Sequence, residues 1–403
     1  MKLLKKFSIS LSLLAIGNTF TVGCESISTA SWNQFKRTPA VILTKLPKPE
    51  RYTTEAELIA VGDIMMHGSQ IKSGYNPQTQ TYNYDRFFTE VQPILSRGDW
   101  VIGNLETTLA GAEAKYTGYP LFNAPDTLAD AIRNAGFNIL TTANNHSLDR
   151  GETGLLKTLE NVRFRGIEPV GTNASLEEAN QILVVEKNDI SMAILAYTYG
   201  TNGIPIPQGK DYLVALIDED KIIADIAKAE DLGVDIVTVA LHFGNEYQRQ
   251  PSQQQKQLVE NLVMAGADII LGSHPHVVQP YEIFEHVDEE GEIHKAVAIY
   301  SMGNFVSNQR ESYKDLGVIF KVKLKKSFPD EMTTITEVDG IPTWVHRYWG
   351  KNKYQFRILP IEATLITKDD PLLSTNQYRK LTENLENMSN HIHSMNTTQN
   401  RTD

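Results

Sequence analysis

The sequence predicts an α/β fold in which strands and helices alternate along the chain. Short, continuous apolar runs recur, which is typical of strands that are buried on both faces of a sheet. Longer segments with helical spacing lie between these runs, and the strand–helix–strand–helix order indicates a layered α/β architecture. The chain has 403 residues, of which 41% are hydrophobic and 22% are charged, and it is therefore long enough for a large core.

Each element is placed by its apolar run and by the residues that flank it. Strands are expected at Leu58–Val61, Trp100–Gly103, Ile139–Ala143, Ser191–Tyr197, Ile236–Leu241, Ile269–Gly272, Ala296–Ser301, Val318–Leu324 and Tyr354–Pro360. Helices are expected at Tyr84–Ser96, Pro125–Asn134, Glu152–Phe164, Asp218–Leu232 and Ser252–Ala265. Prolines suit helix starts at 125 and 251, while glycines suit helix ends at 136, 166, 233 and 266.

The first 24 residues predict a lipoprotein signal peptide. A basic start is followed by the uncharged apolar run Phe7–Val22 and by Gly23-Cys24, which is a secretory pattern. The small residues before Cys24 resemble a bacterial lipoprotein cleavage box, although Thr21 replaces the more usual leucine. Lipid attached to Cys24 would anchor the protein at the extracytoplasmic face of the bacterial cell membrane. A plain secreted protein and an uncleaved anchor are the alternatives.

Three further regions follow the predicted signal peptide. Residues 25–55 are rich in Ser, Thr, Pro and Lys and predict a tether, with the ordered domain beginning near Glu57. The folded domain is expected to span residues 56–367. Residues 368–403 predict a polar tail with a helix at Leu372–Met388, and we expect His391 and His393 there to be solvated. Cys24 is the only cysteine, so no disulfide can form within one chain.

The charge of the chain excludes one class of partner. The net charge is −11, and nucleic-acid binding needs clustered Lys and Arg, so no nucleic acid is expected as the main partner. An anionic polymer stays open as a substrate, because bound cations would offset the local field.

Polar residues able to bind metal stand at the ends of five predicted strands. The most informative is the pair His274 and His276, which follows the apolar run Asp268–Leu271. Neutral imidazole is a common ligand of transition metals. The other four ends are Val61-Gly62-Asp63, Gly103-Asn104-Leu105-Glu106, Ala143-Asn144-Asn145-His146 and Ala240-Leu241-His242. Alone, each residue has an ordinary explanation such as a helix cap or a turn. Together they predict a metal site at one edge of a sheet.

The types of ligand indicate the chemistry. Asp63 and Glu106 supply carboxylates, Asn145 supplies an amide oxygen, and His242 joins the two histidines of the Gly-Ser-His-Pro-His run. Such nitrogen and oxygen ligands without thiolate suit two ions of Mn, Fe or Zn, which can activate water. His146 is then free to act as the catalytic general acid.

The same motifs, followed by Tyr300-Ser301-Met302-Gly303-Asn304-Phe305, resemble the capsule-biosynthesis CapA family over about residues 57–367. That family is associated with poly-γ-glutamate synthesis or export and belongs to the calcineurin-like metallophosphoesterase superfamily. The resemblance implies a four-layer αββα sandwich. It implies that Asp63 and His276 hold a first ion, that Asn145, His242 and His274 hold a second, and that Glu106 bridges them. His146 would be the catalytic histidine, and the auxiliary site residues would be His67, Asn104, Glu246 and Asn304.

Two positions depart from the superfamily. Glu106 stands where the usual bridging residue is Asp, which lengthens the reach of the carboxylate by one methylene. The second departure lies in the first motif of the superfamily. This motif is Asp-x-His, but position 65 is a methionine, and a thioether is a poor ligand for these ions. His67 is expected to swing in if the turn allows. Three functions stay open: a membrane-tethered accessory protein of anionic-polymer capsule synthesis that works with synthase subunits, a free-standing extracytoplasmic phosphoesterase, and a non-catalytic scaffold.

Overall fold

The computed structural model describes residues 51–287 and 293–396. The predicted signal peptide, Cys24 and most of the predicted tether lie outside the described residues. Among the helices of the described segments, none is both long and apolar enough to span a bilayer.

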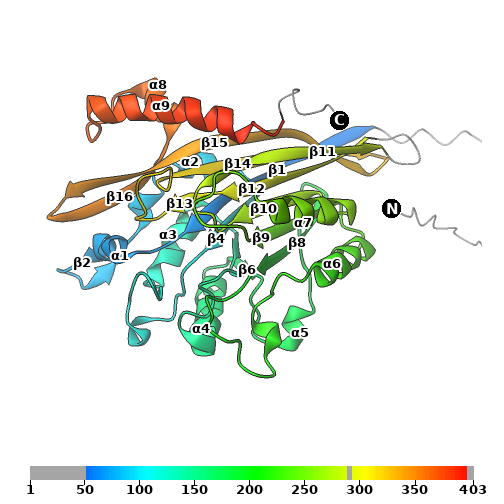
Figure 1. The fold of residues 1–403 in the computed structure, drawn as a ribbon, viewed down its shortest axis with the longest axis horizontal. Helices are drawn as coiled ribbons and strands as arrows, with labels where there is room; N and C mark the ends of the chain where they lie inside the picture. Colours follow the sequence, from blue (N-terminus) through cyan, green and yellow to red (C-terminus); the bar gives the residue numbers. More distant parts are fainter. Residues whose placement is uncertain (1–50, 288–292, 397–403) are drawn as a thin grey trace, which may run out of the picture. The chain divides into compact units, whose positions relative to one another are not determined.

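Two mixed sheets form the centre of the domain (Figure 1). The first runs in the order β16-β15-β14-β1-β4-β5-β6, with β13 paired to β1. Its strands are β16 (Lys353–Pro360), β15 (Met332–Gly350), β14 (Leu316–Phe328), β1 (Tyr52–Ile64), β4 (Trp100–Leu105), β5 (Ile139–Thr141), β6 (Glu168–Val170) and β13 (Asn304–Val306). The second runs in the order β11-β12-β10-β9-β8-β7. Its strands are β11 (Val278–Val287), β12 (Ile293–Met302), β10 (Ile269–Ser273), β9 (Ile236–His242), β8 (Ile190–Thr198) and β7 (Leu183–Lys187).

Helices cover the outer faces of both sheets, whereas the last two helices of the described chain add apolar residues to the cluster between the sheets. The larger helices are α3 (Thr127–Ala135), α4 (Gly151–Phe164), α6 (Glu219–Asp231), α7 (Gln253–Met264) and α9 (Thr375–Ile392). The short ones are α1 (Gly68–Gly74), α2 (Gln92–Leu95), α5 (Leu176–Ala179), α8 (Ile361–Thr367), η1 (Asp85–Phe87), η2 (Ala112–Ala114) and η3 (Asp211–Leu213). A two-stranded hairpin pairs β2 (Tyr75–Asn76) with β3 (Thr81–Tyr82).

Three apolar clusters separate the layers. The central cluster joins residues of both sheets, such as Ile102 of β4 and Leu271 of β10. A second cluster packs the first sheet against α1 to α3, and a third packs the second sheet against α6 and α7. The order helix, sheet, sheet, helix confirms the predicted four-layer αββα sandwich.

Most expected strands and helices form within a few residues of their predicted bounds, but three expectations were wrong. β1 begins at Tyr52, earlier than expected, because its first residues pair with β14. The helix expected at Tyr84–Ser96 is broken into η1 and α2, since Pro93 cannot continue an α-helical ladder from the preceding turn. The tail is not solvated throughout: α9 buries Leu381, Met388 and Ile392 in the central cluster.

The two tail histidines sit at the end of α9, which Figure 1 shows beside β15. His391 Nε2 lies 3.0 Å from the carbonyl oxygen of Val278 in β11, and the His393 ring packs edge-on to Tyr281. His391 is half-buried and helps to dock the helix, in contrast to the expectation that it is solvated, whereas His393 is exposed as expected.

Candidate metal centre

A bulge turns Asp63 toward the second sheet. Along β1, Ala60 packs between the sheets and Val61 packs toward the helices, so a regular strand would point Asp63 at the helices. The pairing of β1 with β4 shifts register between Val61 and Asp63, which inserts Gly62 as an extra residue. Only glycine fits, because a Cβ at this position would lie 1.9 Å from the carbonyl oxygen of Gly303.

The second sheet contributes the histidines. His242 ends β9, and His274 and His276 follow β10 with φ angles of 100° and 57°. These left-handed conformations are uncommon for residues with a side chain. They point the two rings to one region, with centroids 5.9 Å apart. His276 Nδ1 lies 2.9 Å from Asp63 Oδ2, so the two sheets meet at this pair.

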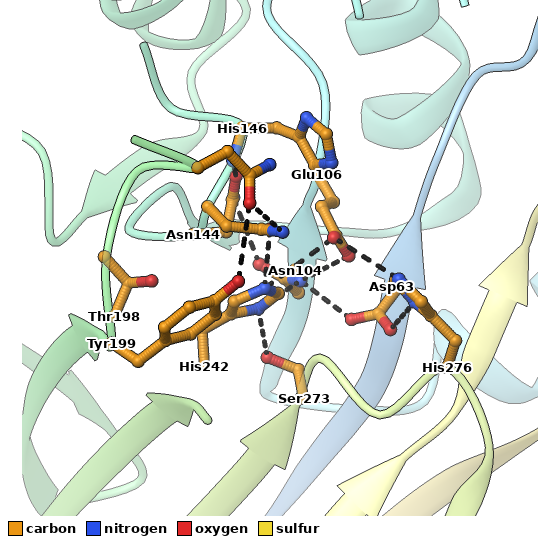
Figure 2. Close-up of polar contacts among 12 residues, drawn as sticks. Asp63, Asn104, Glu106, Asn144, His146, Thr198, Tyr199, His242, Ser273 and His276 are labelled. Carbon is orange, nitrogen blue, oxygen red and sulfur yellow. Dashed lines mark hydrogen bonds and ion pairs between the residues drawn. The ribbon is translucent and has the colours of Figure 1, made fainter. Parts of the chain in front are cut away.

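Two groups of three ligand atoms share one carboxylate. One group contains Asp63, Glu106 and His242, the other contains Glu106, His274 and His276, and within each group the ligand atoms lie within 4.8 Å of one another. Figure 2 shows Asp63, Glu106, His242 and His276 converging from different elements. The shared position of Glu106 agrees with a bridging role. The groups combine the other residues differently from the allotment that the family resemblance implies, and that allotment stays a prediction.

The electrostatics favour a cation. Burial and the neighbouring charge of Asp63 hold the pKa of Glu106 well above its usual range. Burial and the other histidines lower the pKa of His242, and the same causes lower the pKa of His274 to about 4. These rings are therefore neutral at pH 7 and offer lone pairs to a metal.

Unpartnered atoms support the same fit. Within the described structure, Glu106 Oε1 and His274 Nδ1 are buried without a hydrogen-bond partner. Among the described residues, the basic side chains within 4.0 Å of the Asp63 and Glu106 carboxyl groups are His242 and His276. Buried carboxylates that lack a fixed cation and face neutral imidazoles fit a divalent ion.

Two asparagines flank the ligand groups. Asn145 Oδ1 lies 2.9 Å from His242 Nε2, which places its amide oxygen beside the site as expected. Asn104 has a different part: its Nδ2 donates to Asp63 Oδ1 at 2.8 Å and lies 3.3 Å from His242 Nδ1. Asn104 therefore orients ligands with its amide nitrogen.

His146 is held by a residue that the sequence analysis missed. His146 Nδ1 lies 2.7 Å from Asp149 Oδ2, and the Phe122 ring packs edge-on against the imidazole at 4.6 Å. The contact to Asp149 assigns the proton to Nδ1 in the neutral ring and leaves Nε2 for proton transfer. Asp149 follows His146 by three residues, and this spacing could have indicated from the sequence that the two side chains are in contact.

The other auxiliary residues lie around the site. His67 is the N-cap residue of α1; its Nδ1 accepts from the backbone N–H of Asn308 at 3.3 Å and the ring packs against Phe122, so it belongs to neither ligand group. Burial lowers the pKa of His67 to about 4, although the Gln70 side chain opposes this. Met65 is buried. Glu246 is exposed in the loop after β9.

The family of the chain is identified by comparison with known proteins. A family described as bacterial capsule synthesis protein PGA_cap matches residues 57–309. The chain belongs to this family. It is 31% identical over 287 residues to the capsule biosynthesis protein CapA of Bacillus anthracis, covering 70% of this chain and 65% of that protein. It is 29% identical over 329 residues to the PGA biosynthesis protein CapA of Bacillus subtilis strain 168, covering 80% of this chain and 82% of that protein.

The predicted CapA-type family membership is thereby confirmed. Among solved structures, the chain is similar to the calcineurin-like phosphoesterase YfkN of Bacillus subtilis, with 14% identity and a TM-score of 0.42. That match covers 86% of this chain and 100% of the other. A likeness at this level does not identify a reaction, so the chemistry of this PGA_cap protein must be argued from its own residues.

Proposed function

We propose that this PGA_cap protein acts at the extracytoplasmic face of the bacterial membrane in the synthesis or export of an anionic capsule polymer of the poly-γ-glutamate kind. We further propose that it does so through a hydrolytic centre with two divalent ions of Mn, Fe or Zn. The observation that carries the proposal is the pair of ligand groups that share the buried Glu106. The family supports the link to capsule polymer.

The residues divide the work as follows. Asp63, Glu106, His242, His274 and His276 would hold the ions, with Asn145 beside them. Two bound divalent ions supply an activated water and neutralise negative charge that develops as a bond breaks. His146 Nε2 would pass a proton to the leaving group, and Asp149 orients the ring through its contact with Nδ1.

Location and partners belong to the same proposal. The sequence of residues 1–24 supports a lipid anchor at Cys24, and residues 25–55 would give the domain reach from the membrane. We propose synthase subunits of the capsule polymer as partners and the anionic polymer, or a phosphate-containing compound, as substrate. The cations would offset the net charge of −11 where a polyanion approaches.

A single variant tests the proposal. His146→Ala should lower hydrolysis by about a hundredfold to ten-thousandfold while the metal content stays unchanged, because the ring moves a proton and binds no ion. Wild type and variant are assayed with Mn on a phosphodiester, a phosphomonoester and a γ-glutamyl chain, and the lost activity identifies the bond.

Cells that carry only His146→Ala are compared with wild type for capsule polymer. Loss of polymer with intact metal supports catalysis. A normal amount of polymer in that strain means that the protein acts as a scaffold, and the hydrolytic proposal is then wrong.

A further inference from the structure

Asn304 stands next to Asp63 in a row of three residues that faces the second sheet. β1 pairs with β4 on one side and with β13 on the other, and the Cα partners of Asp63 are Asn104 and Asn304. The next residues, Leu105 and Phe305, pack on the helix side of the sheet. Since side chains alternate along a strand, Asn104 and Asn304 project toward the ligands.

The amide of Asn304 is fixed at its nitrogen end. Nδ2 lies 3.2 Å from the carbonyl oxygen of His276, 2.8 Å from the carbonyl oxygen of Lys314 and 3.0 Å from Gln309 Oε1. All three neighbours are acceptors, so the end that faces them carries the hydrogens and the other end is the oxygen.

The oxygen of the Asn304 amide, Oδ1, has no comparable partner among the described residues. The Asn304 side chain is 0% exposed, and within the described structure Oδ1 is buried without a hydrogen-bond partner. A buried acceptor that is left unsatisfied destabilises the folded protein. Anchoring the loop of His276 accounts for Nδ2 but leaves Oδ1 unexplained.

The ligand groups also need more donors. Five side chains with a shared Glu106 form the two groups, and they provide fewer bonds than the roughly eight that two four-coordinate ions take. Neutral amide oxygens are ordinary ligands of divalent ions. An amide oxygen beside Asp63 would fill a coordination position of the ion that Asp63 binds. It would add no negative charge to the buried pair Asp63 and Glu106.

We propose that Asn304 Oδ1 is a further ligand of the metal centre, on the ion that Asp63 binds. This inference rests on the proposed metal centre and names a ligand outside the two groups. The same side chain would hold the His276 loop through Nδ2. Asn304 would thus bind the ion with its oxygen and position His276 with its nitrogen.

Three variants separate a ligand from an anchor. Asn304→Asp keeps an oxygen and loses the Nδ2 donors, whereas Asn304→Leu has a similar shape and loses both. Gln309→Leu removes one acceptor of Nδ2 and leaves Oδ1 in place. Metal-free full-length proteins are titrated with Mn²⁺ by calorimetry, and the bound metal is counted by elemental analysis after dialysis.

We expect Asn304→Leu to bind one ion at least about tenfold to a hundredfold more weakly than wild type, in line with losses seen around metal sites. Asn304→Asp and Gln309→Leu should keep the metal content of wild type. Thermal unfolding of each metal-free protein checks folding, and Asn304→Ala replaces Asn304→Leu under the same criteria if the leucine variant does not fold.

Other outcomes overturn the proposal. Unchanged affinity in Asn304→Leu removes the ligand role, and equal losses in Asn304→Asp and Asn304→Leu show that the residue is only an anchor. Loss of metal in Gln309→Leu to the same extent has the same meaning. If wild type itself binds no ion, the whole metal centre is wrong; if wild type binds two ions and these variants fail, only the role of Asn304 is wrong.

Discussion

Replacing Glu106 by Gln should stabilise the metal-free protein. The Glu106 side chain is 0% exposed, its Oε1 has no hydrogen-bond partner within the described structure, and its carboxylate neighbour Asp63 is equally buried. Glutamine keeps the shape, cannot ionise at a position where burial and Asp63 raise the pKa of the carboxyl group, and places a donor beside Asp63. Relief of an unpaired buried group is worth about 1–2 kcal/mol. For a domain of this size, the melting temperature should rise by roughly 1–3 °C.

The sign should reverse when metal is added. At a free metal concentration of about 100 times Kd, wild type gains about 2.7 kcal/mol, because the ion binds only the folded state. Glu106→Gln loses the ligand that both groups share and should gain much less, so wild type becomes the more stable protein.

Thermal unfolding after dialysis against chelator, with and without Mn²⁺, measures both effects. Glu90→Gln is the matched control: Glu90 pairs with Arg357 at 3.2 Å, away from the ligands, and this variant should respond to Mn²⁺ as wild type does. A full Mn²⁺ response in Glu106→Gln would refute the shared-ligand reasoning.

Three further predictions concern other parts of the chain. Asp149→Asn should lower hydrolysis by about a hundredfold with unchanged metal content, because His146 loses its orienting acceptor; parallel loss of metal and activity would contradict this. Burial alone would raise the pKa of Asp235, but hydrogen bonds from Ser191 and Lys326 outweigh it and lower this pKa. Asp235→Ala should therefore destabilise by about 2–3 kcal/mol at pH 7, a difference in urea unfolding that holds above about pH 4 and fades as pH falls further; a difference that does not change with pH would count against it. Cys24→Ser should release the protein from the membrane in cell fractionation, and a variant that stays bound with its full N-terminus would indicate an ordinary signal anchor.

The sequence predicted the strands that carry ligands because their apolar runs are continuous. β4, β9 and β10 begin at the expected residues, but the polar residues that end them meet between two sheets and not at the edge of one sheet. By contrast, β15 was missed, since Gly340 and Pro342 interrupt its pattern. β15 forms because it pairs with β14, and in that pairing Pro342 lies opposite Val318. The residues of β15 alone give no local signal of this pairing.

Side-chain contacts between segments that are distant in the sequence could not be predicted either. A Cβ at Gly244, which follows the ligand strand β9, would lie 2.5 Å from Gln255 Nε2. That glycine therefore makes room for a side chain of α7. His67 was expected to compensate for Met65, but it is held at the start of α1: its backbone N–H donates to Gln70 Oε1 at 2.9 Å, and its Nδ1 accepts from the backbone N–H of Asn308.

The ligands converge because the backbone departs from regular structure where they lie. In a regular β1, Asp63 would point to the helix layer, and the extra residue Gly62 reverses that direction. His274 and His276 take left-handed conformations that cost energy for residues with a side chain. Such costs persist where the surrounding fold imposes them, and here two packed sheets do so. Metal binding would return part of this cost, which is why removing a shared ligand is expected to stabilise the empty protein and weaken the loaded one.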